Sequence, residues 1–280
     1  MKSKTISVLV TLVSFLLISN ISLVAQKSVE LKYNLETGDK YEFVSDLNQD
    51  ISFEAGGTTM TLEQVMTFKM TSVVDGIEDN IIDKSILFDA IKMNQKIFGM
   101  EISYDSDDST TWTGMTAEVA KEMNKIIGKT AKIAMDNKGN IQEMDISELT
   151  DNDELTNNLT SGNTYAVYPE GKVSIGDSWE TDINPLKDND MKVHMKYTLL
   201  KANRKHAVIG LEGNLSGNEI QGEQINLEGA TVGEMTVDVK TGMLITSTLD
   251  IELALDIEQR GVKIPANIVS TTTTTATKIN

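Results

Sequence analysis

Residues 173–180, VSIGDSWE, repeat the pattern of residues 35–42, LETGDKYE. In both stretches a Gly-Asp pair is followed by one variable residue, an aromatic residue and a glutamate. Gly-Asp is typical of a tight turn, and the aromatic residue after it is typical of the start of a β-strand. A second pair of stretches, residues 136–140 (DNKGN) and 238–242 (DVKTG), also joins apolar-periodic segments. The chain is therefore predicted to use one β unit twice.

Alternation of apolar and polar residues marks the long strands. Residues 58–75 and 243–258 both alternate in this way, which predicts antiparallel strands with one buried face. At about 3.3 Å per residue the second strand would be roughly 53 Å long, so it must twist with its sheet. After a turn predicted at Asp75-Gly76, residues 80–93 carry apolar side chains on both faces, which predicts cover on both sides.

One helix interrupts the strands at residues 115–127, where apolar residues recur at helical spacing: Met115, Val119, Met123, Ile126 and Ile127. Gly128 is placed to cap its C-terminus. The polar residues 147–163 have room for one short helix. The threonine run at 271–275 continues an alternating apolar pattern, so we expect it to lie in a closing strand.

The expected organisation is a signal peptide at 1–25, a first β half with the helix at 26–150, a connector at 151–164 and a second β half at 165–280. The expected fold class is mainly β. The two related halves form a strongly curved antiparallel sheet, half-barrel or incomplete barrel, folded as one compact unit with the helix inserted. An integral outer-membrane barrel is the rival architecture, but aromatic residues make up only 5% of the chain and form no visible girdle.

Three short motifs resemble a family of secreted or periplasmic domains of unknown function from Bacteroidota. They are Tyr-Asp-Ser-Asp at 104–107, Gly-Asp-Ser-Trp at 176–179 and Asp-x-Lys-Thr-Gly at 238–242. The resemblance extends over residues 29–280 and implies an envelope location and a β architecture. It implies no activity and no catalytic residues, because none are assigned to the family. In shape, the expected fold is similar to periplasmic lipoprotein carriers.

The first residues predict export. Lys2 and Lys4 precede an apolar run at 6–18, and Ala25 offers a small residue at a cleavage position, as in a secretory signal peptide. We therefore expect a periplasmic or extracellular protein with no transmembrane segment in the mature chain. The sequence contains no cysteine, which excludes disulfide bonds and thiolate chemistry.

The formal net charge is −17, and loss of Lys2 and Lys4 would make it more negative. Nucleic acid and anionic lipid surfaces are bound through Lys and Arg, so neither is an expected partner. The simplest interpretation is an acidic, solubilising surface; sites for divalent cations or basic partners are the alternative.

No catalytic motif emerges from the sequence. His194 and His206 have no ligand partners at zinc spacing, and Ser178 lacks the glycine that follows the serine of a nucleophile elbow. We therefore predict no enzyme activity and no cofactor, with a carboxylate-dependent hydrolase as the least favoured function.

Asp105, Asp107 and Asp108 are weak candidates for calcium ligands. The loop has Thr110 where an EF-hand requires glycine and Thr116 where it requires glutamate. A solvated acidic turn is therefore the preferred interpretation, and no metal is predicted.

Methionine is the unusual apolar choice, with 14 residues. Flexible thioethers fill irregular cores and also suit surfaces that accept varied apolar ligands. The leading hypothesis is a non-enzymatic envelope protein that binds a lipid or apolar peptide in a Met-rich concave face, which the helix either covers or permanently plugs. The speculative ligand-binding residues are Met66, Phe68, Met70, Met115, Met123, Met195 and Trp179. The alternative is an interaction protein that docks another envelope component through its sheet edges.

Overall fold

A computed structural model describes residues 28–55, 57–97, 99–149, 166–183, 191–220, 223–259 and 262–279. The expected signal peptide, the connector and most of the polar segment at 147–163 lie outside these residues. The strands are β1 (Val29–Glu30), β2 (Lys40–Ala55), β3 (Thr58–Glu78), β4 (Ile81–Ile97), β5 (Met100–Asp105), β6 (Thr130–Asp136), β7 (Ile141–Asp145), β8 (Lys172–Val173), β9 (Ser178–Ile183), β10 (Lys192–Ala202), β11 (His206–Ile220), β12 (Glu223–Asp238), β13 (Leu244–Gln259) and β14 (Val262–Ile279). The helices are the short 3₁₀ helix η1 (Ser109–Thr111) and α2 (Met115–Met123).

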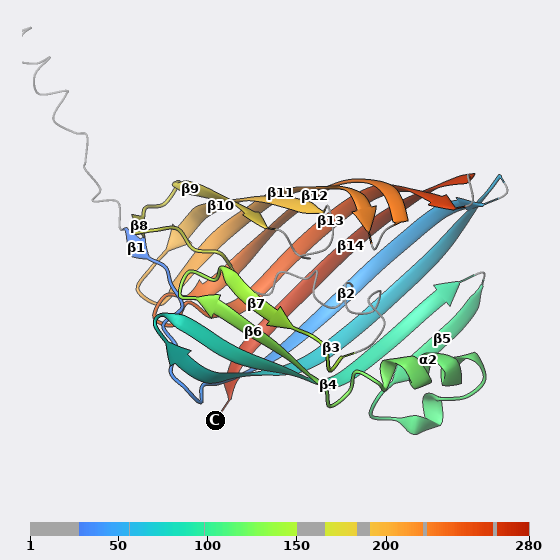
Figure 1. The fold of residues 1–280 in the computed structure, drawn as a ribbon, viewed down its shortest axis with the longest axis horizontal. Helices are drawn as coiled ribbons and strands as arrows, with labels where there is room; N and C mark the ends of the chain where they lie inside the picture. The colour runs from blue at the N-terminus through green and yellow to red at the C-terminus, as the bar shows by residue number, and fades with distance from the viewer. Residues whose placement is uncertain are drawn as a thin grey trace, which may run out of the picture.

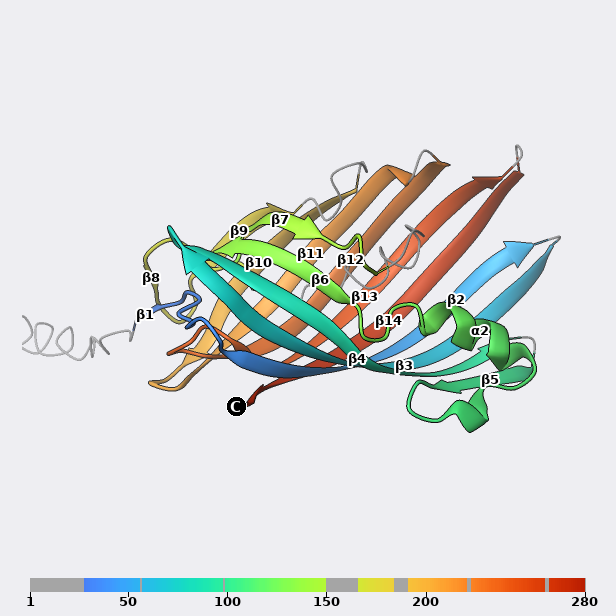
Figure 2. The same cartoon turned by 60° about the horizontal axis from the view of Figure 1, so that its bottom comes forward.

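The fold is mainly β, as predicted, and its main element is one antiparallel sheet of 12 strands. The order is β7-β6-β4-β3-β2-β14-β13-β12-β11-β10-β9, with β5 paired to β4 beside β6. Strands of the first half thus lie on one side of the β2–β14 pairing and strands of the second half on the other. The sheet curves strongly without closing, because its described edges, β7 and β9, are not paired with each other (Figures 1 and 2).

The repeated Gly-Asp stretches form the same turn twice. Gly38 and Gly176 have φ angles of 91° and 93°, a conformation that glycine adopts without steric cost. The amide of Gly38 donates to the carbonyl of Val74 and the amide of Gly176 donates to that of Leu199, each at 2.8 Å. In return, the Val74 and Leu199 amides donate to the carbonyls of Asp39 and Asp177, at 2.9 and 3.0 Å.

The Asp136 and Asp238 turns are also equivalent. Each aspartate accepts, through its side chain, hydrogen bonds from backbone amides two and three or four residues later, which closes the β6–β7 and β12–β13 hairpins. The segment at 31–35 runs over both turns: the Tyr33 amide donates to the Asn137 carbonyl and the Asn34 amide to the Thr241 carbonyl. We call this end of the sheet, with its Gly-Asp turns, the closed end.

Two bulges in the first half differ from the sequence prediction. Strand β3 continues through Asp75-Gly76, where the pairing with β4 shifts, and the chain turns instead at Asp79 and Asn80, which have φ angles of 49° and 67°. A second shift skips Asp89, so Phe88 pairs with Met70 while Ala90 pairs with Lys69. This extra residue moves the following apolar residues of β4 onto the same face as Phe88. The expectation of apolar cover on both faces of residues 80–93 was therefore wrong.

The helix is shorter than predicted. It ends at Met123 instead of residue 127, and its buried residues are Thr116 and Ala120. Met115, expected on the inward face, is 51% exposed. The predicted strand through the threonine run is confirmed: it is part of β14, which pairs with β13 and β2 in the middle of the sheet.

Two hydrophobic clusters cover part of the concave face. The first, at the closed end, brings together residues from both flanks of the sheet, including Phe43, Met135, Tyr197, Leu199 and Val237. Side chains of strands as distant as β6 and β10 belong to this one cluster, which identifies this face as the concave one. The second cluster packs α2 residue Ala120 and nearby Ile126 against inward-facing residues of β3–β5, among them Met66, Met93 and Tyr104.

Candidate functional site

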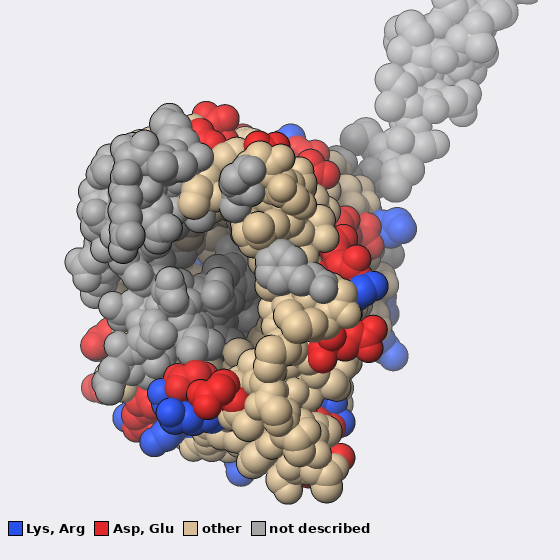
Figure 3. All heavy atoms as spheres, turned by 90° about the vertical axis from the view of Figure 1, so that its right-hand side faces the viewer, with Lys and Arg blue, Asp and Glu red and all other residues tan. Residues whose placement is uncertain are grey.

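The concave face changes character toward the opposite end of the sheet, where the β2–β3 and β13–β14 hairpins turn. We call this the open end; seen from it, the surface is hollowed (Figure 3). Directly paired residues of neighbouring strands form rows across this face. One row, the aliphatic row, consists of Leu253, Ile268, Ile51, Leu62 and Ile97 on five adjacent strands. All five side chains are only half-buried.

A second row lies nearer the open end and is also apolar: Leu227, Leu255, Ala266, Phe53 and Met60. Strands lie about 4.8 Å apart, so each five-strand row is roughly 19 Å wide. The two rows together form a broad apolar surface on the inner side of the sheet.

The convex face is polar. Its threonines and carboxylates are hydrogen-bonded across strands: Thr67 donates to Asp46 at 2.7 Å and Thr271 to Asp250 at 2.6 Å. The Lys69 ammonium forms an ion pair with Glu42 at 2.8 Å. The sheet is therefore amphipathic, with water-facing polar groups outside and aliphatic groups inside.

Glycines on the concave face bring neighbouring strands unusually close together. A Cβ at Gly233 would lie 2.3 Å from the Thr248 carbonyl oxygen, and one at Gly229 would lie 2.7 Å from that of Glu252. A Cβ at Gly213 would lie 2.3 Å from the Met195 sulfur. Side chains at these positions would collide with the adjacent strand, so the glycines permit the close approach and strong curvature seen in β11–β13.

The predicted ligand-binding residues fall into separate places. Met66, Phe68, Met70 and Met123 meet in or beside the second cluster, under α2. Met195 is buried in the first cluster. Trp179 stacks on Tyr197 with ring centroids 5.6 Å apart, and its indole N–H donates to the Val167 carbonyl at 2.7 Å. Trp179 is thus held by the closed end, whereas Met115 faces away from the cluster.

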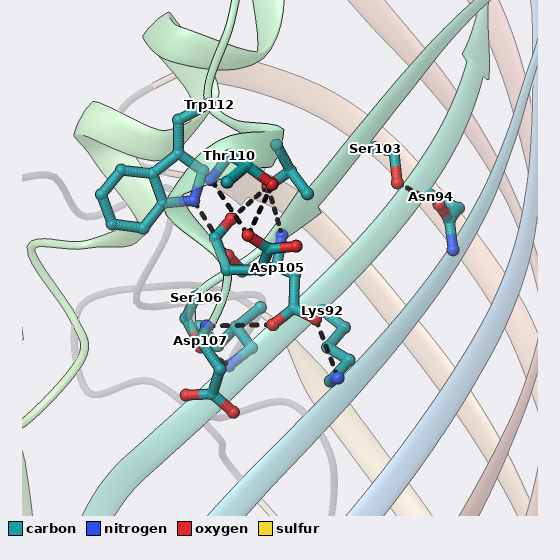
Figure 4. Close-up of polar contacts among 11 residues, drawn as sticks. Lys92, Asn94, Ser103, Asp105, Ser106, Asp107, Thr110 and Trp112 are labelled. Atoms are coloured by element: carbon teal, nitrogen blue, oxygen red, sulfur yellow. Dashed lines mark hydrogen bonds and ion pairs between the residues drawn. The ribbon is translucent and has the colours of Figure 1, made fainter.

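Residues 105–111 form a compact acidic turn (Figure 4). Asp105 forms an ion pair with Lys92 at 2.8 Å and accepts from the Asp107 amide, and both interactions hold the pKa of Asp105 below its usual value. Asp108 caps η1 by accepting from the Thr110 amide. The Asp107 carboxylate points away from this network (Figure 4). Within the described ranges, no group of three His, Asp or Glu side chains is arranged to hold a metal ion.

Next to this turn, Tyr104 donates to the Asn124 side chain at 2.9 Å and stacks with Trp112, whose indole N–H donates to the Asp105 carbonyl. Burial, followed by the charges of Asp105 and Asp107, raises the pKa of Tyr104 to about 12. The Tyr-Asp-Ser-Asp motif at 104–107 therefore joins β5 to the helical segment. The contacts of Tyr104 and Asp105 stabilise this junction.

His194 lies on the polar face of β10 and is paired with acidic residues of the neighbouring strand. Its Nδ1 lies 2.8 Å from Asp182 and its Nε2 lies 3.8 Å from Glu180, both on β9. The hydrogen bond to Asp182 raises the pKa of His194. This exposed cluster has the character of a cross-strand charge pair at the sheet edge.

Sequence reasoning missed several inward-facing polar residues. Gln49, Gln64 and Gln95 are directly paired on β2, β3 and β4, in the row next to the aliphatic row. Lys84 is also inward-facing, between Val74 and Ile133, and is only 1% exposed. The period-two alternation of β3 places Gln64 on its apolar face. This was the signal in the sequence that could have identified an inward-facing polar residue.

In the described part of the chain, no helix has the length and apolar character needed to cross a membrane. No curated protein matches the chain. Among solved structures, one of lipovitellin that concerns lipid–protein interactions gives a TM-score of 0.54 at 10% identity. The alignment covers 88% of this chain and 26% of lipovitellin, so the chain spans about a quarter of that protein. At this identity the likeness concerns the fold alone.

Two further structures give much lower TM-scores, which do not support a shared fold. The translocator domain of the autotransporter NalP from Neisseria meningitidis gives 0.22, at 7% identity, over 85% of this chain and 89% of that one. A DUF1329 family protein from Desulfovibrio piger gives 0.14, at 8% identity, over 86% and 84%. Residues 145–244, which include the second Gly-Asp turn, match the model of a family of unknown function, DUF6263.

Proposed function

We propose that the protein is an exported, non-enzymatic envelope protein that binds a hydrophobic ligand, a lipid or an apolar peptide, in its concave face. The observation that carries this proposal is the aliphatic row: five adjacent strands each present a Leu or Ile side chain that is only half-buried. The closed end of the same face is filled by its own side chains.

The physical argument is the free-energy cost of exposing aliphatic side chains to water. Each square ångström of apolar area removed from water contributes about 25 cal/mol, so a ligand that covers these rows gains free energy in proportion to the covered area. Contiguous exposed apolar surface on a soluble protein commonly marks a binding site. Among the described residues the polar convex face has no comparable aliphatic row, so the ligand belongs on the inner side.

Other observations agree with this proposal. The fold resembles that of lipovitellin, a protein whose structure is described in terms of lipid–protein interactions. The two lysines and the apolar run near the start of the sequence favour export, and the resemblance of the three motifs to secreted Bacteroidota domains favours an envelope location. We assign no catalytic residue, since Asp105 and Asp108 act within a structural turn.

Docking through a sheet edge is the weaker candidate. The described edge strands β5, β7 and β9 have only 6, 5 and 6 residues. Strand β9 also carries Glu180 and Asp182. Short, charged edges are typical of sheets that avoid pairing with another strand, whereas a long uncovered edge would favour such a partner.

The first test is native mass spectrometry of the mature protein purified gently from its own host, followed by organic extraction and lipid analysis. We expect a stoichiometric lipid or apolar peptide. If the protein is free of ligand and takes up neither acyl lipids nor apolar peptides when they are offered, the proposal is wrong.

Two neighbouring residues of β14 provide matched variants. Ile268 lies in the aliphatic row, whereas Val269 lies on the convex face and is 52% exposed. A carboxylate in the aliphatic row would have to lose its hydration under the ligand, so Ile268→Glu should abolish ligand retention. Val269→Glu should retain it. Leu253→Glu, on β13, repeats the test if Ile268→Glu does not fold by circular dichroism.

A further inference from the structure

A polar row follows directly behind the aliphatic row. Two residues along the strands from Ile51 and Leu62, or about 7 Å, the concave face presents Gln49, Gln64 and Gln95 on three neighbouring strands. Ser270 on β14 pairs with Gln49 and extends the row to a fourth strand. We call these four residues the glutamine row.

The glutamine row retains unused hydrogen-bonding capacity. All three glutamine side chains are half-buried. The Gln64 amide donates to the Met66 sulfur at 2.5 Å, and sulfur is a weak acceptor. Among the described residues, the side chains of Gln49 and Gln95 take part in none of the hydrogen bonds of the structure. Each glutamine has two N–H donors and one carbonyl acceptor to offer a ligand.

Charge is absent around the glutamine row. The row itself, the two apolar rows toward the open end and the next row toward the closed end, which includes Leu47, Met66 and Met93, contain no Asp, Glu, Lys or Arg among the described residues. An anionic or cationic head group placed here would lose hydration without gaining a counter-charge, which is costly. An uncharged polar group would be accepted by the amides.

The glutamine row also lies at the boundary between the buried cluster under α2 and the half-buried apolar rows of the open end. Toward the closed end, Met66 and Met93 are buried in the cluster under α2. Toward the open end, the aliphatic row is half-buried, as are Leu255, Phe53 and Met60 of the second apolar row. The two rows extend about 13 Å from Gln49. An amphiphile with its polar group at the glutamine row would therefore lay its chain along the two apolar rows toward the open end.

From this arrangement we propose that the ligand is a neutral acyl lipid, with an uncharged ester, amide or hydroxyl group held by the glutamine row and its chain on the aliphatic row. This inference rests on the proposed function and specifies the ligand class. The ligand is matched to the site by its charge and polarity: an uncharged polar group contacts the glutamine row, and an apolar chain covers the rows toward the open end.

The test compares three probes that each have a twelve-carbon chain: monolauroylglycerol, laurate and dodecyltrimethylammonium. The delipidated mature protein is titrated with each below its critical micelle concentration, by isothermal calorimetry. We expect monolauroylglycerol to bind at least about tenfold more tightly than either charged probe, a factor that one net hydrogen bond supplies. The triple variant Gln49→Leu, Gln64→Leu, Gln95→Leu should lose this preference while still binding acyl chains.

Gln142→Leu, on the exposed edge strand β7, is the matched control and should behave like the unchanged protein. Gln49→Leu alone provides a second measurement if the triple variant does not fold. Equal or tighter binding of a charged probe, or an unchanged preference in the triple variant, would overturn the inference and leave the carrier function standing. Failure of all three probes together with apolar peptides would overturn both.

Discussion

Tyr33 and Tyr168 meet at the closed end of the sheet, with ring centroids 5.1 Å apart and planes inclined by 46°. Their backbone amides donate to adjacent carbonyls of one turn, those of Asn137 and Lys138. The Tyr33 hydroxyl donates to the Ala166 carbonyl, and the Tyr168 hydroxyl donates to the Gly242 carbonyl at 2.6 Å. The pair thereby joins the equivalent turns of the two halves.

Removal of the Tyr168 hydroxyl should weaken the closed end. Burial raises the pKa of Tyr168, so the group remains a neutral donor across the ordinary pH range. Tyr168→Phe leaves the buried Gly242 carbonyl without this donor, and we expect a loss of roughly 1–3 kcal/mol in the free energy of unfolding. Urea denaturation followed by circular dichroism measures it. Tyr33→Phe, which removes a longer bond of 3.1 Å, should cost less; an unchanged midpoint for Tyr168→Phe would contradict the assignment.

The curvature of the second half should depend on Gly233. A Cβ there would meet the Thr248 carbonyl, which is backbone and cannot move without its strand. We expect Gly233→Ala to lower the free energy of unfolding by about 1–3 kcal/mol. Gly210→Ala is the control, because its Cβ would meet only the flexible side chain of Leu200, at 3.2 Å. Equal urea midpoints for the two variants would show that close approach at Gly233 is unimportant.

The pKa of His194 should be higher than that of an ordinary histidine. The hydrogen bond with Asp182 and the nearby Glu180 favour the imidazolium and raise its pKa. A raised folded-state pKa means that the pair stabilises the protein below the unfolded-state value of about 6.5, and that this contribution is lost as pH rises through the folded-state pKa. The effect on stability is small because the pair is exposed.

NMR titration of the His194 ring protons measures this pKa. In Asp182→Asn the largest cause of the shift is removed, so the midpoint should move down. An identical midpoint in both proteins would exclude Asp182 as the cause.

Local chemistry made much of the fold predictable from the sequence. The two Gly-Asp turns and the two aspartate-capped turns were recognisable because their side chains bond to backbone amides only a few residues away. Alternation in β3 and β13 identified the faces of both strands, since a period of two survives wherever pairing is regular.

The candidate site was less predictable because it depends on register between strands. The turn at Asp79 and Asn80, rather than Asp75-Gly76, sets which residues of β3 and β4 are paired, and the extra residue at Asp89 shifts the phase again. The glutamine row exists only in that final register. The methionine pattern predicted a site that the structure places under α2 and at the closed end, whereas the half-buried row toward the open end consists of Leu and Ile side chains.

The pairing of β2 with β14 has a consequence for how the chain folds. Ser45 and Thr274 share a hydrogen bond of 2.9 Å across this pairing although they are 229 residues apart in sequence. The other long strands pair with neighbours in the chain through hairpins, which close quickly. Joining β2 to β14 requires the ends of a long loop to meet, which costs more entropy and is slow. We therefore expect two preformed meanders to assemble late, with their aliphatic inner faces still uncovered in the interval.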